Sequence, residues 1–116
     1  MMQPQAQASL QFVRNVLSPM PGFNEKPCYG TPGFYVGKKL IARIREDGET
    51  LVVQSHEREI WMDKDPAVFF ITDHYLNYDY VLVALADVAP EDLKTLLFTA
   101  WRNRATKSLL KEAGLL

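Results

Sequence analysis

The sequence has few of the residues that form crosslinks or metal sites. Its 116 residues include one cysteine, Cys28, and two histidines, His56 and His74. One cysteine cannot form an internal disulfide and suits a reducing compartment, and these three residues lack the spacing of zinc ligands. We therefore expect a cytoplasmic protein without a metal ion or other cofactor.

Long hydrophobic runs are also missing. The longest lies around residues 81–86 and is far shorter than the ~20 apolar residues that span a bilayer. The start of the chain has no basic segment followed by an apolar one, so it does not resemble a secretory signal. We expect residues 1–7 to be a disordered lead-in, residues 8–116 to form a single domain, and no contact with a membrane.

An excess of one charge is absent as well, although the charges are separated along the chain. The formal net charge is −1. Residues 1–45 carry six basic residues and one acid, residues 46–92 two basic residues and twelve acids, and residues 93–116 five basic residues and one acid. A basic surface for a polyanion such as DNA is one interpretation. Ordinary solvated charge, balanced within the fold, is the other, and the near-neutral total favours it.

Apolar periodicity predicts a long helix near each end of the chain. Residues 8–17 place apolar side chains three and four positions apart, and Pro19 ends that helix. The second helix should begin at Pro90, with acids in its first turn and Arg102 and Arg104 near its end. Its apolar stripe consists of Leu93, Leu96, Leu97, Ala100 and Trp101.

Shorter elements are expected between and after these helices. Ser55 is a suitable N-cap for a short helix that runs to about Lys64. Thr106 suits the same role for a last helix that ends near Gly114. The strands predicted from apolar runs in between are residues 67–72 and residues 80–86, joined by a loop.

Side chains that would face the core alternate with outward-facing ones along residues 34–53. Turn residues interrupt this pattern twice, which predicts two hairpins. Asp47-Gly48 is typical of a two-residue type I′ turn. The resulting pairs are Arg45 with Thr50, Ile44 with Leu51, Arg43 with Val52, and Ala42 with Val53. Apolar pairs then share the core face, and the basic residues lie on the opposite face.

The turn at Gly37 leaves the register of the first hairpin open. A three-residue loop would keep four apolar residues on one face, whereas a two-residue loop would not. Those four residues are Phe34, Val36, Leu40 and Ala42.

Together these elements predict a helix, three or four strands, a helix, two strands and two helices. The hairpins make the sheet mainly antiparallel. Helices on one face of such a sheet give a two-layer α+β sandwich.

Aromatic residues form one candidate site. The loop before the last strand contains a histidine and two tyrosines, and other aromatic residues could approach it in the fold. The candidate pocket residues are Tyr29, His74, Tyr75, Tyr78 and Trp101. Such rings line ligand pockets or stack on bases. They also tie loops to a sheet through buried hydroxyl groups, and this structural role is the alternative.

Basic residues form a second candidate site. Arg43 and Arg45 alternate on the face away from the core, and Lys38 and Lys39 lie at a hairpin tip. A basic β-ribbon can enter a DNA groove. The same residues can simply solubilise an exposed sheet and protect its edge.

No arrangement of catalytic residues is recognisable. Cys28 and His74 would need the fold to bring them together, and a lone small cysteine more often has a packing role. The GTPGF segment lacks the spacing and the lysine of a phosphate-binding loop. We therefore expect a protein that is not an enzyme.

Three motifs resemble those of one family. They are YG-x-P-x-F-x-V from Tyr29 to Val36, a His-Tyr pair followed by a tyrosine at positions 74–78, and Ala-Trp at 100–101. With these motifs the chain resembles the MmcQ/YjbR-like family of small bacterial proteins, from about residue 10 to residue 110. It departs from the family at Gly33, where alanine is more common, and at Asp79, where proline is.

The resemblance implies a secretion-chaperone-like α+β fold, similar to the double-wing DNA-binding domain of a phage transcription factor. It thereby implies DNA binding through a basic sheet face and hairpin tips. The residues expected to contact DNA are Lys38, Lys39, Arg43 and Arg45, with Arg102, Arg104 and Lys107 as support. The alternative is a module that binds a protein or a small ligand near His74, Tyr78 and Trp101. We expect a monomer or a weak dimer.

Overall fold

The computed structural model describes residues 4–116, and the side chains of residues 7–116. Six strands form one sheet in the order β1-β2-β3-β4-β6-β5, and all neighbours are antiparallel. The elements are α1 (Pro4–Leu17), β1 (Phe23–Cys28), β2 (Thr31–Val36), β3 (Lys39–Ile44), β4 (Thr50–Gln54), α2 (Arg58–Lys64), β5 (Phe69–Phe70), the 3-10 helix η1 (Asp73–Tyr75), β6 (Tyr80–Ala84), α3 (Pro90–Arg104) and α4 (Lys107–Glu112).

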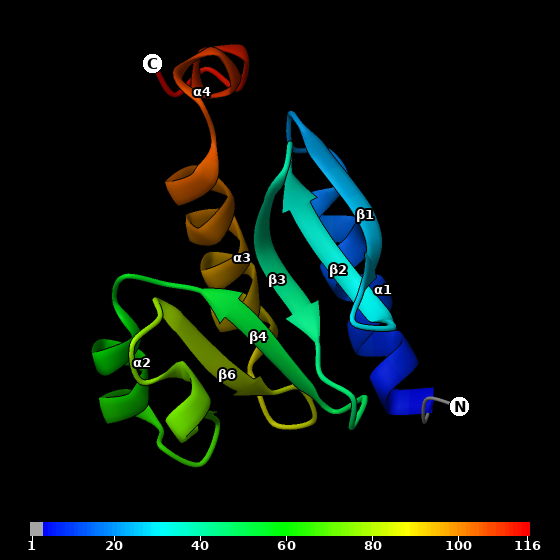
Figure 1. The fold of residues 1–116 in the computed structure, drawn as a ribbon, viewed down its shortest axis with the longest axis vertical. Coiled ribbons are helices and arrows are strands. Elements are labelled where there is room, and N and C mark those ends of the chain that lie inside the picture. Colours follow the sequence, from blue (N-terminus) through cyan, green and yellow to red (C-terminus); the bar gives the residue numbers. More distant parts are fainter. Residues whose placement is uncertain (1–3) are drawn as a thin grey trace.

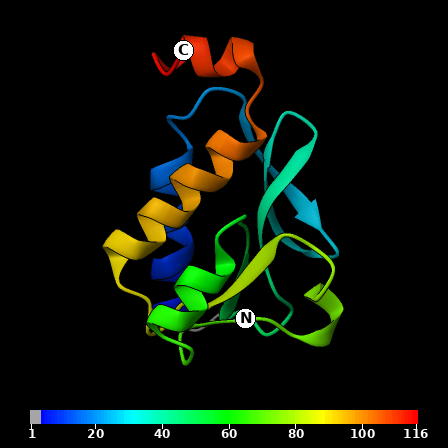
Figure 2. The same cartoon turned by 90° about the vertical axis from the view of Figure 1, so that its left-hand side faces the viewer.

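The two long helices cover one face of the sheet. Figure 1 shows α1 and α3 behind the strands, and Figure 2 shows them on one side of the sheet with η1 on the other. Buried side chains of both helices and of the strands form one apolar core. The predicted two-layer α+β sandwich is therefore confirmed. The opposite face of the sheet is covered only where the segment around η1 crosses it.

The first helix is longer than predicted. It begins at Pro4 rather than at residue 8, so residues 4–7 are helical and the predicted disordered lead-in is wrong there. Proline suits the first helical position because its missing N–H would have no partner there, and the glutamines and alanine that follow are good helix formers. Residues 1–3 of that predicted lead-in lie outside the described part of the chain.

The C-terminal helices follow the prediction. Helix α3 begins at Pro90, and its buried residues are the five of the predicted stripe. The indole Nε1 of Trp101 donates a hydrogen bond of 2.8 Å to the carbonyl oxygen of Pro21. The Thr106 hydroxyl caps α4 by accepting a hydrogen bond from the Leu109 N–H. The Trp101 hydrogen bond fixes the end of α3 against the loop between α1 and β1.

The middle of the chain differs more from the prediction. Helix α2 begins at Arg58 instead of directly after Ser55. The Ser55 hydroxyl accepts a hydrogen bond from the Glu57 N–H, but the Ser55 N–H donates to the Asp79 carbonyl and so extends the sheet. Strand β5 is also short, with two residues instead of the predicted 67–72.

The register of the β3–β4 hairpin is confirmed, but its turn type is not. Ile44 pairs with Leu51 as predicted. The Gly48 N–H bonds the Arg45 carbonyl at 2.9 Å, which makes Glu46 and Asp47 the central residues. Asp47 has no positive φ, as a type I′ turn would need, whereas Gly48 has φ +71°. The Asp47 carboxylate instead accepts the N–H groups of Glu49 and Thr50.

A β-bulge settles the register of the β2–β3 hairpin. Val36 pairs with Lys39 and Tyr35 with Leu40, which leaves a two-residue turn, and the register then shifts so that Phe34 pairs with Ala42. The extra residue is Ile41, which is fully buried in the core. Leu40 therefore lies on the outer face, away from the apolar residues it was grouped with.

Candidate functional site

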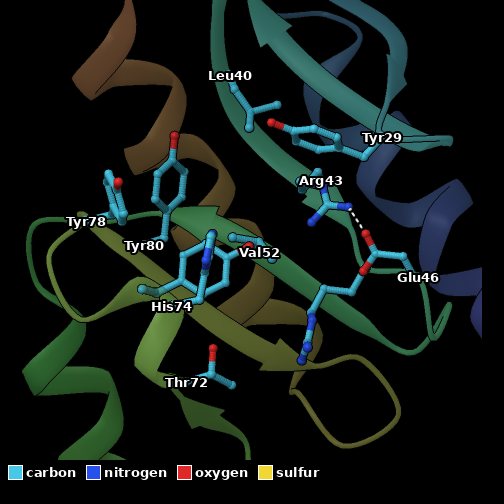
Figure 3. Close-up of a pocket in the computed structure, with 11 residues that line it drawn as sticks. Tyr29, Leu40, Arg43, Glu46, Val52, Thr72, His74, Tyr78 and Tyr80 are labelled. Carbon is cyan, nitrogen blue, oxygen red and sulfur yellow. Dashed lines mark hydrogen bonds and ion pairs between the residues drawn. The ribbon is translucent and has the colours of Figure 1, made fainter.

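An open pocket lies on the face of the sheet opposite α1 and α3. It has a volume of about 760 Å³. Figure 3 shows that its floor is formed by β3 and β4, with Tyr29 on one side and His74, Tyr78 and Tyr80 on the other. The lining residues are Tyr29, Leu40, Arg43, Arg45, Glu46, Val52, Thr72, His74, Tyr75, Tyr78 and Tyr80.

Arg43 is the buried charge of this pocket. Its neighbours Ala42 and Ile44 face the core, so the alternation of a strand turns Arg43 to the other face, where it is only 7% exposed. Its Nη2 donates to Glu46 Oε1 at 2.6 Å and lies 3.4 Å from Thr31 Oγ1. Its Nε is buried without a hydrogen-bond partner among the described residues. Arg43 thus lines the pocket and keeps one covered donor, Nε, without an acceptor.

The ion pair between Arg43 and Glu46 holds both groups in their charged forms. Burial lowers the pKa of Arg43, but the interactions with Glu46 and Tyr75 outweigh this effect and raise the pKa above its ordinary value. The hydrogen bond from Arg43 lowers the pKa of the Glu46 carboxyl. The Glu46 side chain is 66% exposed, in contrast to 8% for Arg43. The arginine is therefore fixed in the site, whereas its partner is at the rim.

Tyr29 reaches the pocket from a strained turn. It is the only non-glycine residue with positive φ (+54°) in the described part of the chain, and Gly30 follows with φ +80°. Cys28 and Thr31 are paired. Tyr29 and Gly30 are therefore the central residues of a type I′ turn between β1 and β2. The ring is 86% exposed, and its centroid lies 5.4 Å from the Arg43 guanidinium carbon.

The opposite wall is an aromatic cluster around η1. The ring of His74 lies 4.7 Å from that of Tyr75 and 6.1 Å from that of Tyr78, measured between centroids. Tyr75 in turn lies 6.0 Å from Tyr80. The structure therefore brings together four of the five predicted pocket residues, from two segments 45 positions apart at Tyr29 and His74.

Arg58 holds this wall in place, and the sequence analysis missed it. Its guanidinium donates hydrogen bonds to four backbone carbonyls, those of Tyr75 (2.8 Å), Leu76 (2.9 Å), Tyr78 and Tyr80 (3.1 Å). Its side chain is 14% exposed. The available signal was that Arg58 is one of two basic residues in the acidic segment 46–92.

The family model described as YjbR matches residues 19–103. This chain belongs to the YjbR family. The match contains every residue that lines the pocket, and it confirms the resemblance seen in the sequence motifs.

Similar proteins support the fold of this YjbR-family protein. The chain is 24% identical to a solved structure, Deinococcus radiodurans protein DR2400 with its DUF419 domain, with a TM-score of 0.70 over 92% of this chain and 88% of that one. Over 47 residues it is 40% identical to uncharacterized proteins of Mycobacterium tuberculosis and Mycobacterium bovis. That stretch is 40% of this chain and 36% of those relatives, so the chain matches about a third of their length.

Trp101 of the YjbR domain does not belong to the pocket. Trp101 is a residue of α3 that is fully buried in the core, on the helical side of the sheet. The prediction that it joins the aromatic cluster is therefore wrong. The physical reason is its place in the apolar stripe of α3, which the core requires.

The predicted basic residues form two groups and not one continuous face. Arg43 is buried and paired, which corrects its predicted role as an exposed DNA contact, and Arg45 lines the same pocket. Lys38 and Lys39 are exposed at the β2–β3 turn, where the Gly37 N–H bonds the Gly22 carbonyl. The remaining members, Arg102, Arg104 and Lys107, lie at the end of α3 and the start of α4.

The second group lies around the loop between α1 and β1, and its members are Lys38, Lys39, Arg102, Arg104 and Lys107. That loop binds the β2–β3 turn through Gly22 and the end of α3 through Pro21. It also contacts α4, because a Cβ on Gly22 would lie 2.7 Å from a methyl carbon of Leu109. Figure 1 shows this turn and α4 at the same end of the molecule.

Within residues 4–116, no three side chains of His, Cys, Asp or Glu lie close enough to hold a metal ion. None of the helices described here is long and apolar enough to cross a bilayer.

Proposed function

We propose that this YjbR-family protein is a binding protein whose pocket holds a small ligand with an acidic group. The observation that carries the proposal is the buried Arg43, whose Nε has no partner. A buried donor without an acceptor costs about 1–3 kcal/mol. A carboxylate or phosphate that pairs with the Arg43 guanidinium in the pocket would offset that cost.

The composition of the pocket supports the same proposal. Ligand sites are mostly apolar with a few polar groups that fix orientation. Here Leu40 and Val52 line the same pocket as Arg43. Arg43 and Arg45 face a single acid, Glu46, so one positive charge is left for a ligand. Low local polarity strengthens hydrogen bonds from a guanidinium to an anion.

The test compares small acids with their neutral analogues. Benzoate, acetate and phosphate, with benzamide and acetamide as controls, are titrated while amide chemical shifts are followed by NMR. We expect the acids, and not the amides, to shift residues of β3 and of the segment around η1. Arg43→Gln should remove the effect, whereas Arg102→Gln, which changes an exposed arginine outside the pocket, should not. Equal shifts in the Arg43→Gln protein, or none in the wild type, would overturn the proposal.

DNA binding remains a second candidate, supported by the exposed basic group around the loop at Pro21 and Gly22. Phosphate contacts make such binding steeply dependent on salt. Glu substitutions at Lys38 and Lys39 together should abolish retardation of duplex DNA at ~50 mM salt. Arg43→Gln should leave retardation unchanged. Absence of retardation of the wild-type protein at that salt concentration would exclude this candidate.

We also propose that the protein acts by binding and not by catalysis, and that it is cytoplasmic. Cys28 interacts with Tyr35, whose pKa it raises, rather than with a general base. Its thiol is free, which suits a reducing compartment. Mixing the protein with any ligand found above and following the ligand by mass spectrometry tests the first point, because a binding protein returns the ligand unchanged.

A further inference from the structure

We infer that the acidic ligand of this pocket also carries a flat, unsaturated ring, with the acid on Arg43 and the ring between Tyr29 and the aromatic wall of His74 and Tyr78. This inference rests on the proposed function, because it describes the rest of the ligand that Arg43 holds. It names a ligand class, a planar acid, and assigns Tyr29 the role of selecting it.

Tyr29 is an unexpected residue for its backbone conformation. Both central positions of a type I′ turn have positive φ, which favours asparagine, aspartate or glycine and disfavours a bulky side chain. Its φ is +54°, yet the ring is 86% exposed and gains little from burial. Turn formation and the core do not require a tyrosine here, and the ring's printed contact is with the Arg43 guanidinium of the pocket. Strained residues of this kind concentrate at ligand sites, and this one lines the pocket.

The two walls are placed to hold a ring between them. Figure 3 shows Tyr29 and His74 on different sides of the pocket, with Arg43 and Val52 between them. Tyr78, which is 57% exposed, and His74 extend the far wall into solvent. A volume of about 760 Å³ suits a ligand of one or two rings with an acidic group.

The aromatic wall is held in place by the protein itself. Arg58 binds the carbonyls of the segment that carries it, including those of Tyr75 and Tyr80. Fixed walls reduce the entropy lost when a ligand binds. A rigid slot with a charge at its base selects flat ligands over saturated ones of similar size.

The first experiment separates the ring from the acid by calorimetric titration. The probes are AMP with adenosine and ribose 5-phosphate, and indole-3-acetate with cyclohexaneacetate. We expect AMP to bind about tenfold or more tightly than ribose 5-phosphate, and indole-3-acetate than cyclohexaneacetate, which is the effect of one stacking interaction. Adenosine, which has the ring without the acid, should also bind more weakly than AMP. A preference for AMP would indicate a phosphate ligand, and a preference for indole-3-acetate a carboxylate. Equal binding of indole-3-acetate and cyclohexaneacetate would overturn the inference.

The second experiment changes Tyr29. Tyr29→Asn suits the turn, so the variant should fold with a melting temperature at or above that of the wild type. It should bind planar acids about tenfold more weakly, with ribose 5-phosphate unaffected. Tyr29→Phe keeps the ring and should bind as the wild type does. Unchanged affinity of Tyr29→Asn for the planar acids would overturn the inference.

The two proposals fail in different ways. If small acids bind in a manner that depends on Arg43, but without preference for a planar ring, only the inference about the ring is wrong. If no acid binds to the wild-type protein, both proposals are wrong.

Discussion

At the scale of single residues, the pairing of Arg43 with Glu46 determines how the pocket can be used. The arginine is buried, whereas the glutamate is at the rim on the β3–β4 turn. Its carboxylate already occupies Nη2, at 2.6 Å. Glu46 is thus an internal acid in the place where a ligand acid would bind, and it competes with such a ligand.

Removing the Glu46 charge should therefore increase affinity for acids. We expect Glu46→Gln to bind indole-3-acetate severalfold more tightly than the wild type, measured by calorimetric titration. Glu49→Gln is the matched control, because Glu49 is an exposed acid on the same turn that does not line the pocket. Affinity that is equal or lower in Glu46→Gln would show that Glu46 supports the ligand instead of competing with it.

Gly33 lies where the pairing of β1 with β2 leaves little room for a side chain. A Cβ on Gly33 would lie 2.7 Å from the Cβ of Cys28 and 3.0 Å from the Lys26 carbonyl oxygen. Alanine at this position would need β1 and β2 to shift. Only the strand pairing shows why glycine suits this position.

At the scale of elements, the β3–β4 turn depends on the Asp47 carboxylate. It accepts hydrogen bonds from the Glu49 N–H (2.8 Å), the Thr50 N–H (3.0 Å) and the Thr50 hydroxyl (2.9 Å). Burial raises the pKa of Asp47, but these donors outweigh it and the pKa is lowered. Its stabilising effect is therefore present above the pKa of about 3.9 that Asp has in an unfolded chain, and is lost as the pH falls through the lower folded value.

The hairpin should thus contribute to acid sensitivity. We expect the free energy of unfolding of the wild type to fall more steeply below a pH of about 4 than that of Asp47→Asn. Urea unfolding at a series of pH values measures this difference. Parallel pH profiles of the two proteins would show that the Asp47 charge does not stabilise the turn.

The segment around η1 depends on Arg58 in a similar way. Lysine keeps the charge but lacks the planar group that reaches several carbonyls at once. Arg58→Lys should lower stability by about 1–3 kcal/mol, because several carbonyls, two of them in part-buried contacts, lose a charged donor. Amide hydrogen exchange of residues 75–80 should become faster, and planar acids should bind more weakly. The matched control is Arg14→Lys, which changes an arginine whose side-chain hydrogen bonds go to an exposed carboxylate on the helical side. Unchanged exchange of residues 75–80 in Arg58→Lys would contradict this role.

At the scale of the whole molecule, the sheet separates the apolar core from the candidate pocket. The core and Trp101 lie on one side, and the pocket lies on the other. Trp101→Phe removes the hydrogen bond to the Pro21 carbonyl and leaves space in the core. It should lower the free energy of unfolding by about 1–3 kcal/mol. Affinity of the folded protein for planar acids should stay the same, and a clear loss of affinity would show that the two faces are coupled.

Much of the architecture could be predicted from the sequence, because it follows from local chemistry. The apolar stripe of α3, the Thr106 cap and the β3–β4 register each depend on residues close together in the chain. The sequence also indicated most of the aromatic residues of the pocket, because four of the five candidates line it. Strand β1 was harder, because its charged residues and Pro27 give it a weak pattern that only an edge strand tolerates.

What the tertiary structure alone decided is where each charge and ring lies. The alternation of β3 places Arg43 on the outer face, where Tyr29 and Thr31 from the first hairpin lie against it. The segment around η1 is held by Arg58 from a different element. The bulge at Ile41 depends on the pairing of β2 with β3, so spacing within one strand cannot reveal it. The sequence by itself determined most of the elements and, apart from Leu40, the inner faces of the hairpin strands, because apolar periodicity is local. The pocket arises from segments distant in the chain, and only the folded sheet brings them together.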